Sequence, residues 1–331
     1  MKVARLFAVN DLRLQEEDLP VPGPGELLLR VRVVGICGSD LHWFLEGGIG
    51  DARLERPLVL GHEFSAQTES GQLVAVDPSL PCGQCEFCLK GNPNLCPNVR
   101  FAGHADQDGG LREYIAWDER RLYPLPQSLS AEDGVLLEPL GVALHAVGLG
   151  KLQSGMTVGV YGCGPIGLLI LQLARLYGAG KIIATDALPH RVRAAESFGA
   201  DQAYLSSGKQ DVGLVMAVTA GRGVDLAFEV AGVPETVDLS VDSVVPGGTV
   251  VLVGIPEDDS TTFSASTARR KGLTIKLSRR MQHSYPRAID LVSRSLVDVR
   301  SLVTHRFPLQ EAPYAFKAAS QRIGLKTIIE L

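Results

Sequence analysis

The sequence lacks the features of an exported or membrane-spanning chain. It contains no eighteen-residue apolar run free of charged residues, so we expect no membrane-spanning helix and no membrane partner. The residues that follow Met1 lack the apolar stretch of about seven residues that a signal peptide needs. We therefore expect a cytoplasmic protein.

Positive charge is scarce and scattered. The net charge is −5, and no run of Lys and Arg is longer than the three residues Arg269-Arg270-Lys271. A surface that follows nucleic-acid phosphates needs a basic stripe, so we expect no nucleic-acid partner. Internal repeats and low-complexity tracts are also missing. The 331 residues exceed the size at which a single hydrophobic core stops growing, about 250–300 residues, which predicts two domains.

Cysteine is uncommon but concentrated. Four of the six cysteines lie within fifteen residues, at Cys82, Cys85, Cys88 and Cys96. This spacing is typical of structural zinc, where four thiolates complete the tetrahedron and leave no position for substrate. Iron–sulfur sequences begin with the same cysteine spacing and have a proline after the last cysteine, where this chain has Pro97. Their last two cysteines, however, are separated by three residues, whereas seven residues separate Cys88 and Cys96 here. We predict a structural zinc, and clustered reduced thiols again indicate a cytoplasmic location.

The character of the chain changes after about residue 155. Residues 1–140 read as β-rich and irregular, with recurrent turn residues. Beyond them, short apolar strands alternate with helix-length segments, which predicts a parallel sheet covered on both faces. The expected strands are 157–161, 181–186, 225–230, 249–253 and 273–276, and a strongly apolar helix is expected at 165–177. The fold class is therefore α/β: a β-rich domain over 1–140, to which 280–331 return, and a doubly wound domain over 141–279.

A glycine-rich motif follows the first of these strands. Its G-x-G-x-x-G pattern, between a strand and a helix, is typical of dinucleotide-binding Rossmann folds. The first glycine permits the tight turn, the second lets the backbone approach the pyrophosphate, and the third lets helix and strand pack closely. The helix N-terminus adds free N–H groups and partial positive charge. We expect the cofactor to contact Gly162, Gly164, Pro165, Ile166 and Gly167.

The end of the next strand favours NAD over NADP. Asp186 lies nineteen residues beyond Gly167, where a carboxylate accepts hydrogen bonds from the adenosine ribose and repels a 2′-phosphate. The alternative is an ordinary surface aspartate at a strand end. Arg191 could hold a 2′-phosphate, but its position on the following helix favours a solvated side chain. We predict NAD as cofactor, with both side chains at its site.

A second set of zinc ligands is available in the first 140 residues. Cys37, His62 and Glu63 are far from the cysteine cluster, and Glu138 offers another carboxylate. Catalytic zinc takes three protein ligands from Cys, His and carboxylate and keeps one position open. Either Glu63 or Glu138 could supply the third. Adjacent strand residues point to opposite faces, so His62 and Glu63 can bind one metal only if that segment turns.

Each of these residues has an ordinary structural explanation when taken alone. Cys37 could be a small core residue, and Glu138, which precedes a proline, could be a helix cap. Together, however, the motifs resemble zinc-dependent medium-chain dehydrogenases over essentially the whole chain. The residues that carry the resemblance are 37–42, 61–63, 82–96 and 162–167. Within that family, the polyol branch of sorbitol and L-iditol dehydrogenases is the most similar, through 98–101, 138–140 and 303–309.

The resemblance implies a GroES-like catalytic domain, a Rossmann coenzyme domain, an active site between them, and a homo-oligomer, either a tetramer or a dimer. It also implies two zinc ions per chain. Cys37, His62 and Glu63 would bind the catalytic zinc, and Glu138 would act through bound water or exchange with Glu63.

The resemblance implies roles for five more residues. Ser39 would begin a proton relay that passes through the nicotinamide ribose to His42. Phe101 and Arg280 would line the substrate side, next to Trp43. An aromatic phenol is common in the branch where Trp43 stands, and an indole donates a hydrogen bond but offers no hydroxyl acceptor. The pocket is therefore expected to favour a substrate other than sorbitol.

These expectations combine into one hypothesis about function. We predict an NAD-dependent zinc enzyme that transfers a hydride from a secondary hydroxyl of a polyol and releases a ketose. The rival activities are L-threonine and 2,3-butanediol dehydrogenase. A remote alternative is a non-catalytic NAD-binding protein, which would be expected to have lost a metal ligand.

Overall fold

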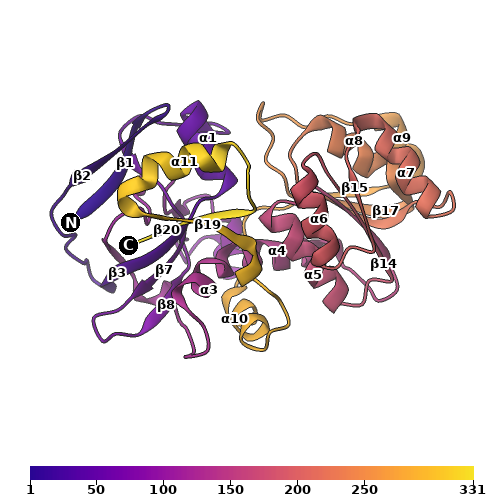
Figure 1. Ribbon diagram of the computed structural model, residues 1–331. Helices are drawn as coiled ribbons and strands as arrows, with labels where there is room; N and C mark the ends of the chain where they lie inside the picture. The colour runs from indigo at the N-terminus through magenta and orange to yellow at the C-terminus, as the bar shows by residue number, and fades with distance from the viewer. The chain divides into compact units, whose positions relative to one another are not determined.

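The computed structural model describes the backbone of residues 1–331 and every side chain apart from that of Lys209. The chain divides into two compact units (Figure 1). The first combines Met1–Gly141 with Gln282–Leu331, and the second is Val142–Met281. Both ends of the chain, indigo and yellow in Figure 1, therefore build one unit, and the middle builds the other.

The first unit is organised around β3, the strand that leads to Cys37. The sheet has the order β12-β8-β7-β3-β20-β19, and β11 also pairs with β3. The strands are β3 (Glu26–Gly35), β7 (Glu63–Gln67), β8 (Leu73–Val76), β11 (Tyr114–Asp118), β12 (Leu122–Pro124), β19 (Val303–Pro308) and β20 (Lys326–Glu330). Gly35 of β3 lies opposite Glu63 of β7 on one side and Ile328 of β20 on the other.

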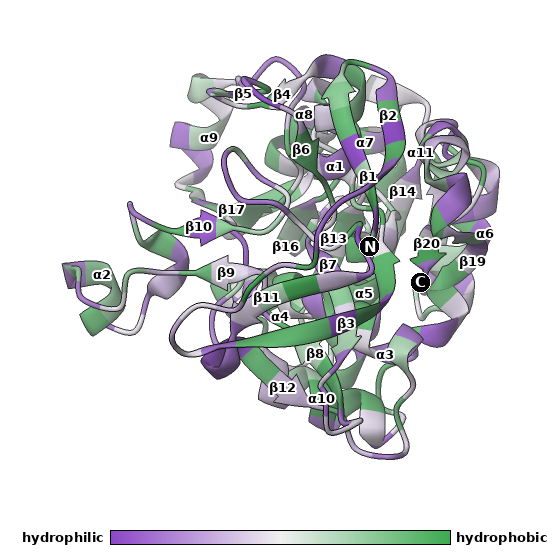
Figure 2. Ribbon diagram, turned by 90° about the vertical axis from the view of Figure 1, so that its left-hand side faces the viewer, coloured by the Kyte–Doolittle hydropathy of each residue, from purple (hydrophilic) through white to green (hydrophobic). Residues whose placement is uncertain are grey.

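The composition of β3 explains its central position. Leu29, Val31 and Val33 are buried, whereas Arg30 is exposed, and Figure 2 shows the strand as mainly apolar. Alternation of this kind is typical of a strand with one face on the core. Phe44 and Phe316 belong to the same core, with ring centroids 5.4 Å apart.

The other elements of this unit are short strands and helices around the sheet. The short helix α2 lies on a loop that extends away from the strands (Figure 2). These elements are β1 (Lys2–Ala8), β2 (Asp11–Glu16), β4 (Gly48–Ile49), β5 (Ala52–Arg53), β6 (Leu58–Val59), β9 (Ser79–Leu80), β10 (Arg100–Phe101), α1 (Gly38–Glu46), α2 (Glu86–Leu89), α3 (Ala131–Val135), α10 (Tyr285–Ser293) and α11 (Ala312–Ser320). Single 3₁₀ turns occur at Pro93–Leu95, Glu119–Arg121, Arg300–Leu302 and Leu309–Glu311.

The second unit is a six-stranded sheet of order β15-β14-β13-β16-β17-β18, and all its pairs are parallel. The prediction of a doubly wound parallel sheet is confirmed. The strands are β13 (Thr157–Tyr161), β14 (Lys181–Asp186), β15 (Gln202–Leu205), β16 (Val224–Glu229), β17 (Val244–Leu252) and β18 (Thr274–Leu277). The helices are α5 (Pro165–Leu176), α6 (Pro189–Ser197), α7 (Asp211–Val218), α8 (Pro234–Ser243) and α9 (Ala265–Lys271), with a 3₁₀ turn at Gly208–Gln210.

Two strands of this sheet differ from the sequence-based expectation. β15 was not expected, because three of its four residues are only partly buried, Leu205 is exposed, and the segment carries a weak apolar pattern. β17 begins at Val244 rather than at 249, because Val244 pairs with Val224 before the register shifts. The turn residues Pro246 and Gly247 lie inside that strand and conceal its start in the sequence.

Helix α4 (Leu137–Gly150) follows α3 and crosses the boundary between the units. The helical stretch Ala131–Gly150 is long and apolar enough to cross a membrane by length and composition alone. In its most apolar window, 72% is buried inside the protein, as in the core helix of a folded domain.

Candidate functional site

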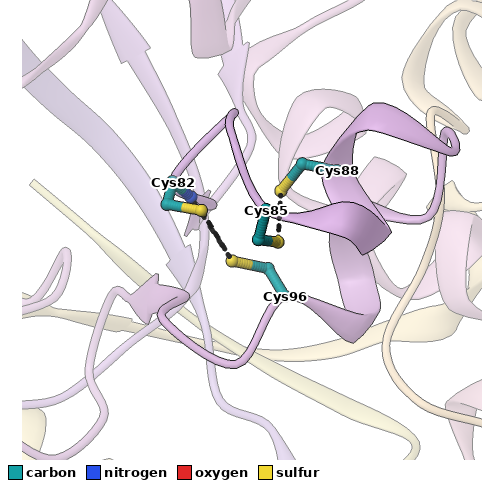
Figure 3. Close-up of side chains that lie close together, drawn as sticks. All are labelled: Cys82, Cys85, Cys88 and Cys96. Atoms are coloured by element: carbon teal, nitrogen blue, oxygen red, sulfur yellow. Dashed lines mark hydrogen bonds between the residues drawn. The ribbon is translucent and has the colours of Figure 1, made fainter.

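The four clustered cysteines converge on one point of the first unit. Figure 3 shows their side chains turned toward one another from the loop that carries α2. The four sulfur atoms lie within 4.8 Å of one another, and the pairs Cys82–Cys96 and Cys85–Cys88 are 3.5 Å apart. A tetrahedral zinc with Zn–S bonds of about 2.3 Å separates its sulfurs by about 3.8 Å. The cluster therefore fits a four-thiolate zinc.

The backbone around the cluster favours the ionised form of one ligand. N–H groups of Gln84 and Cys85 point at Cys82 and lower the pKa of its thiol to about 6. Zinc binds the thiolate rather than the thiol, so this cysteine is ready to bind the ion at neutral pH. All six cysteines of the chain are free thiols.

A second group of metal donors meets at the carboxyl end of β3. Cys37 caps the start of α1, and Glu63 is the first residue of β7. One donor atom from each of Cys37, His62 and Glu63 lies within 4.8 Å of the others. The group contains the thiolate, imidazole and carboxylate that catalytic zinc accepts, and three protein ligands leave a fourth position open. These residues fit a catalytic zinc.

A turn allows His62 and Glu63 to share this point. His62 lies before the strand, directly after Gly61, whose φ is 91°. A side chain at position 61 would be strained by that φ and would also meet Val34. Because His62 is outside the pleated strand, the alternation of faces does not separate it from Glu63. The turn that the ligand hypothesis required is present.

The buried carboxylate of Asp40 orients the histidine. Its Oδ1 lies 3.4 Å from His62 Nδ1 and accepts a hydrogen bond from the Gly61 N–H at 3.1 Å. Its Oδ2 accepts one from the Cys37 N–H at 2.9 Å. Burial opposes a charge on His62, but the negative charges of Asp40 and Cys37 raise its pKa well above its usual value. Asp40 therefore holds one ring nitrogen and leaves the other for metal, as partners of metal-bound histidines commonly do.

Two further buried charges lie close to the donors. Lys326 of β20 forms an ion pair with Glu63, and both side chains are almost fully buried. Glu138 of α4 lies outside the 4.8 Å donor group, although it too is buried. Burial, together with the nearby charge of Glu63, raises the pKa of Glu138 to about 7. Of the two carboxylates considered as third ligand, Glu63 is the one in the donor group, and its role stays a proposal.

Two of the residues expected to move protons or line the substrate side, Ser39 and Phe101, lie next to His62. Ser39 Oγ lies 3.4 Å from His62 Nε2. His42, one turn further along α1, pairs through Nδ1 with the Glu46 carboxylate at 3.0 Å. The Phe101 ring lies 5.4 Å from the His62 ring, centroid to centroid.

Sequence reasoning missed three residues of this neighbourhood. Trp43 is buried, and its ring meets His104 edge-on with centroids 5.5 Å apart, so His104 lies against a side chain that was predicted to line the substrate side. Asp40 stood inside the motif but was given no role. Lys326 could have been noticed as a lysine directly before a strand segment with two adjacent isoleucines, Ile328 and Ile329. No local pattern marks His104.

The second unit places the glycine motif between β13 and α5. Gly162 has a φ of 107°, and a side chain there would collide with the backbone of Val230 and Ala231. A side chain at Gly167 would strike the Gly162 carbonyl, so helix and strand approach closely here. Gly164 caps α5. Pro165 takes the first helical position, where its missing N–H costs nothing, and Ile166 follows it. The cradle fits a dinucleotide pyrophosphate.

Asp186 ends β14 beside this cradle. Its Oδ2 accepts a hydrogen bond from the Cys163 N–H at 2.7 Å, and its Oδ1 accepts one from the Leu188 N–H at 2.9 Å. The position of Arg191 on the following helix favoured a solvated side chain, and this prediction is wrong. Its side chain is only 17% exposed, and its NH1 nitrogen lies 4.0 Å from Asp186 Oδ2. The negative carboxylate attracts the guanidinium, whose NH1 nitrogen lies 3.6 Å from where a Cβ of Gly164 would stand.

Arg280 lies in the second unit, three residues after β18, with a φ of 53°. Phe101 belongs to the first unit. The proximity of Arg280 to the substrate therefore stays a prediction.

Comparison with known proteins gives the family. Residues 23–127 match the alcohol dehydrogenase GroES-like domain, and residues 165–294 match the zinc-binding dehydrogenase domain. The sorbitol dehydrogenase of Bacillus subtilis (strain 168) is 35% identical over 333 residues, which cover 97% of this chain and 94% of the relative.

Two solved structures extend this similarity. L-idonate 5-dehydrogenase from Escherichia coli superposes with a TM-score of 0.92 at 27% identity, over 100% of this chain and 98% of the other. The 2R,3R-butanediol dehydrogenase from Bacillus subtilis superposes with a TM-score of 0.89 at 32% sequence identity, over 100% of this chain and 99% of the other. The chain belongs to the zinc-binding alcohol dehydrogenase family, with a GroES-like and a Rossmann domain. It is a zinc- and NAD-dependent oxidoreductase, so the predicted family, fold class and cofactors are confirmed.

The two donor groups predict two zinc ions per chain with different tasks. Cys37→Ser should lose one zinc and all turnover but keep the fold, because the open site is small and local. Cys85→Ser should lose the other zinc and unfold at lower temperature, since a four-thiolate zinc is worth on the order of 10 kcal/mol in small modules. Metal analysis and thermal melts test both variants. Cys163→Ser, in neither donor group, is the control for zinc content, and a single zinc in the unmodified protein would contradict the prediction.

The position of Asp186 predicts that NAD is preferred over NADP. Asp186→Ser removes the charge that would repel a 2′-phosphate and keeps the positive charge of Arg191 beside the position of that phosphate. The ratio of kcat/KM for NAD to that for NADP should fall at least tenfold, about 1.4 kcal/mol. Asp225→Ser is the control, because Asp225 accepts its hydrogen bond from Thr157 at the opposite end of β13. Equal kcat/KM for the two cofactors in the unmodified enzyme would show that Asp186 does not face the ribose.

Proposed function

We propose that this enzyme oxidises a secondary hydroxyl of a polyol, of the sorbitol or L-iditol type, with NAD and releases the ketose. The observation that carries the proposal is the second buried carboxylate, Glu138, beside a donor group that already contains Glu63. A simple alcohol needs no such acceptor. A polyol presents a further hydroxyl that can donate a hydrogen bond to it, which repays part of the cost of burying a carboxylate.

The roles of the residues follow from their places. Zinc, when bound, is a Lewis acid that lowers the pKa of an alcohol, and NAD accepts the hydride. Cys37, His62 and Glu63 hold the metal. Ser39 Oγ, 3.4 Å from His62 Nε2, is placed to take the hydroxyl proton. His42, paired with Glu46 on the outer turn of α1, is the group that passes the proton toward solvent.

A second candidate is the oxidation of a vicinal diol such as 2,3-butanediol. It is supported by the aromatic side chains Trp43 and Phe101 around the site, which suit a substrate with methyl ends. The similarity to the solved butanediol dehydrogenase points the same way. L-Threonine, the other rival, would require a carboxylate partner for its ammonium group.

We further propose that the protein is a cytoplasmic homo-oligomer, a dimer or a tetramer. The strand β18 pairs only with β17 among the strands that the structure describes, and Leu277 on it is 74% exposed. An apolar edge strand is a ready surface for pairing with another chain. The free thiols of both donor groups suit a reducing compartment. Light scattering that reports a monomer would contradict the oligomer.

A substrate panel tests the proposed function. Sorbitol, xylitol, ribitol, 2,3-butanediol, L-threonine and ethanol are compared by NADH formation, with and without a zinc chelator. A polyol should show the highest kcat/KM, and the chelator should abolish the activity. If ethanol or another primary alcohol is the best substrate, the polyol assignment is wrong and the family assignment stands.

Two variants separate the roles of the residues in that panel. Glu138→Gln should lower kcat/KM for the best polyol by at least tenfold more than for a simple secondary alcohol, because only the polyol has a second hydroxyl, and a neutral amide accepts a weaker hydrogen bond from it than an ionised carboxylate does. Trp43→Tyr should reorder the polyols without changing the zinc content. An equal loss for all substrates in Glu138→Gln would assign Glu138 to the metal rather than to the substrate.

A further inference from the structure

Three neighbouring strands bring one buried lysine to the candidate zinc site. In the order β7-β3-β20, Glu63 and Lys326 lie on the two outer strands and Gly35 lies between them. The two side chains form their ion pair across this glycine. A Cβ at position 35 would collide with Glu63 Oε2 and lie 3.1 Å from Lys326 Cε. The lack of a side chain at Gly35 therefore creates the space in which carboxylate and ammonium meet.

The register of the strands also directs Lys326 toward Cys37. Ile328 lies opposite Gly35 in the antiparallel pair, so Lys326, two residues earlier, extends the same register to position 37. The N–H of Ile36 donates to the Thr327 carbonyl at 3.0 Å, which continues the pairing beyond β3. The charges of Glu63, Cys37 and Asp40 all act on the buried ammonium. Its positive charge is thus set among the negative groups of the donor site.

We propose that Lys326 is a positioning residue that competes with zinc for Glu63. The ammonium holds Oε2, so Glu63 offers the metal its other oxygen. It also offsets one negative charge of the site, which weakens the hold on zinc and keeps the bound ion a stronger electron acceptor. This inference rests on the zinc site of the proposed function, but not on which alcohol is oxidised.

The proposal separates two properties that a purely structural role would change together. Without the ammonium, Glu63 lies buried without its counter-ion in the metal-free protein, and the fold loses stability. A dipositive ion then meets a more negative site and binds more tightly. Stability of the metal-free protein and affinity for zinc should therefore move in opposite directions. If Lys326 only supported the fold, its loss would weaken both or leave the affinity unchanged.

The experiment measures zinc binding to the Cys37, His62 and Glu63 group by chelator competition on the full-length enzyme. Lys326→Met should bind that zinc at least tenfold more tightly than the unmodified protein. Its metal-free form should melt at a lower temperature, and zinc should raise that temperature by more than in the unmodified protein. Lys326→Arg, which keeps the charge, should retain ordinary zinc affinity. Lys181→Met is the matched control, since Lys181 donates to the Val218 carbonyl in the other unit.

Zinc affinity that is unchanged or weaker in Lys326→Met overturns the proposal. If that variant does not fold, Glu63→Gln is compared with the double variant Glu63→Gln/Lys326→Met, in which no buried carboxylate loses its partner. The double variant should bind zinc more tightly than Glu63→Gln alone, and equal affinity again overturns the proposal. Because the readout is metal binding, a failed substrate panel leaves this test intact. A failed zinc test likewise leaves the polyol assignment standing.

Discussion

The pairing of β3 with β7 and β20 is the constraint on which the zinc site depends. The carboxyl end of β3 delivers Cys37, β7 begins at Glu63, and β20 begins at Lys326. Their backbone hydrogen bonds fix the register, so a shift of one residue would turn each side chain to the other face of the sheet. Residues from the two ends of the chain are thereby held within reach of one metal ion.

That arrangement concentrates charge in a place that excludes water. Asp40, Glu63, Glu138 and Lys326 are all buried beside His62. Each isolated charge would be costly there, and the structure offsets the cost through partners: the Gly61 and Cys37 N–H groups for Asp40, and the Lys326 ammonium for Glu63. A divalent cation fits such a net-negative group, and the same burial strengthens its effect on a bound alcohol.

The candidate cofactor site of the second unit depends on backbone conformation, whereas the candidate zinc site of the first unit depends on buried charges. The positive φ of Gly162 and the close contact at Gly167 leave the start of α5 open to a pyrophosphate. Asp186 is held by two backbone N–H groups, which fix the orientation of its carboxylate beside the glycine motif. Arg191 lies beside it, with its NH1 nitrogen 4.0 Å from Asp186 Oδ2.

The sequence by itself determined the features that depend on local spacing. Four cysteines within fifteen residues, a G-x-G-x-x-G between strand and helix, and Asp186 at the next strand end identify zinc, NAD and the Rossmann sheet, because those ligands are bound by short contiguous segments. Only the tertiary structure decided what depends on strands distant in the chain. It brought Lys326 across Gly35 to Glu63, set Asp40 on His62, turned Arg191 inward and placed Glu63 rather than Glu138 in the donor group. No local pattern specifies these contacts, since sheet register and burial arise from the packing of the whole unit.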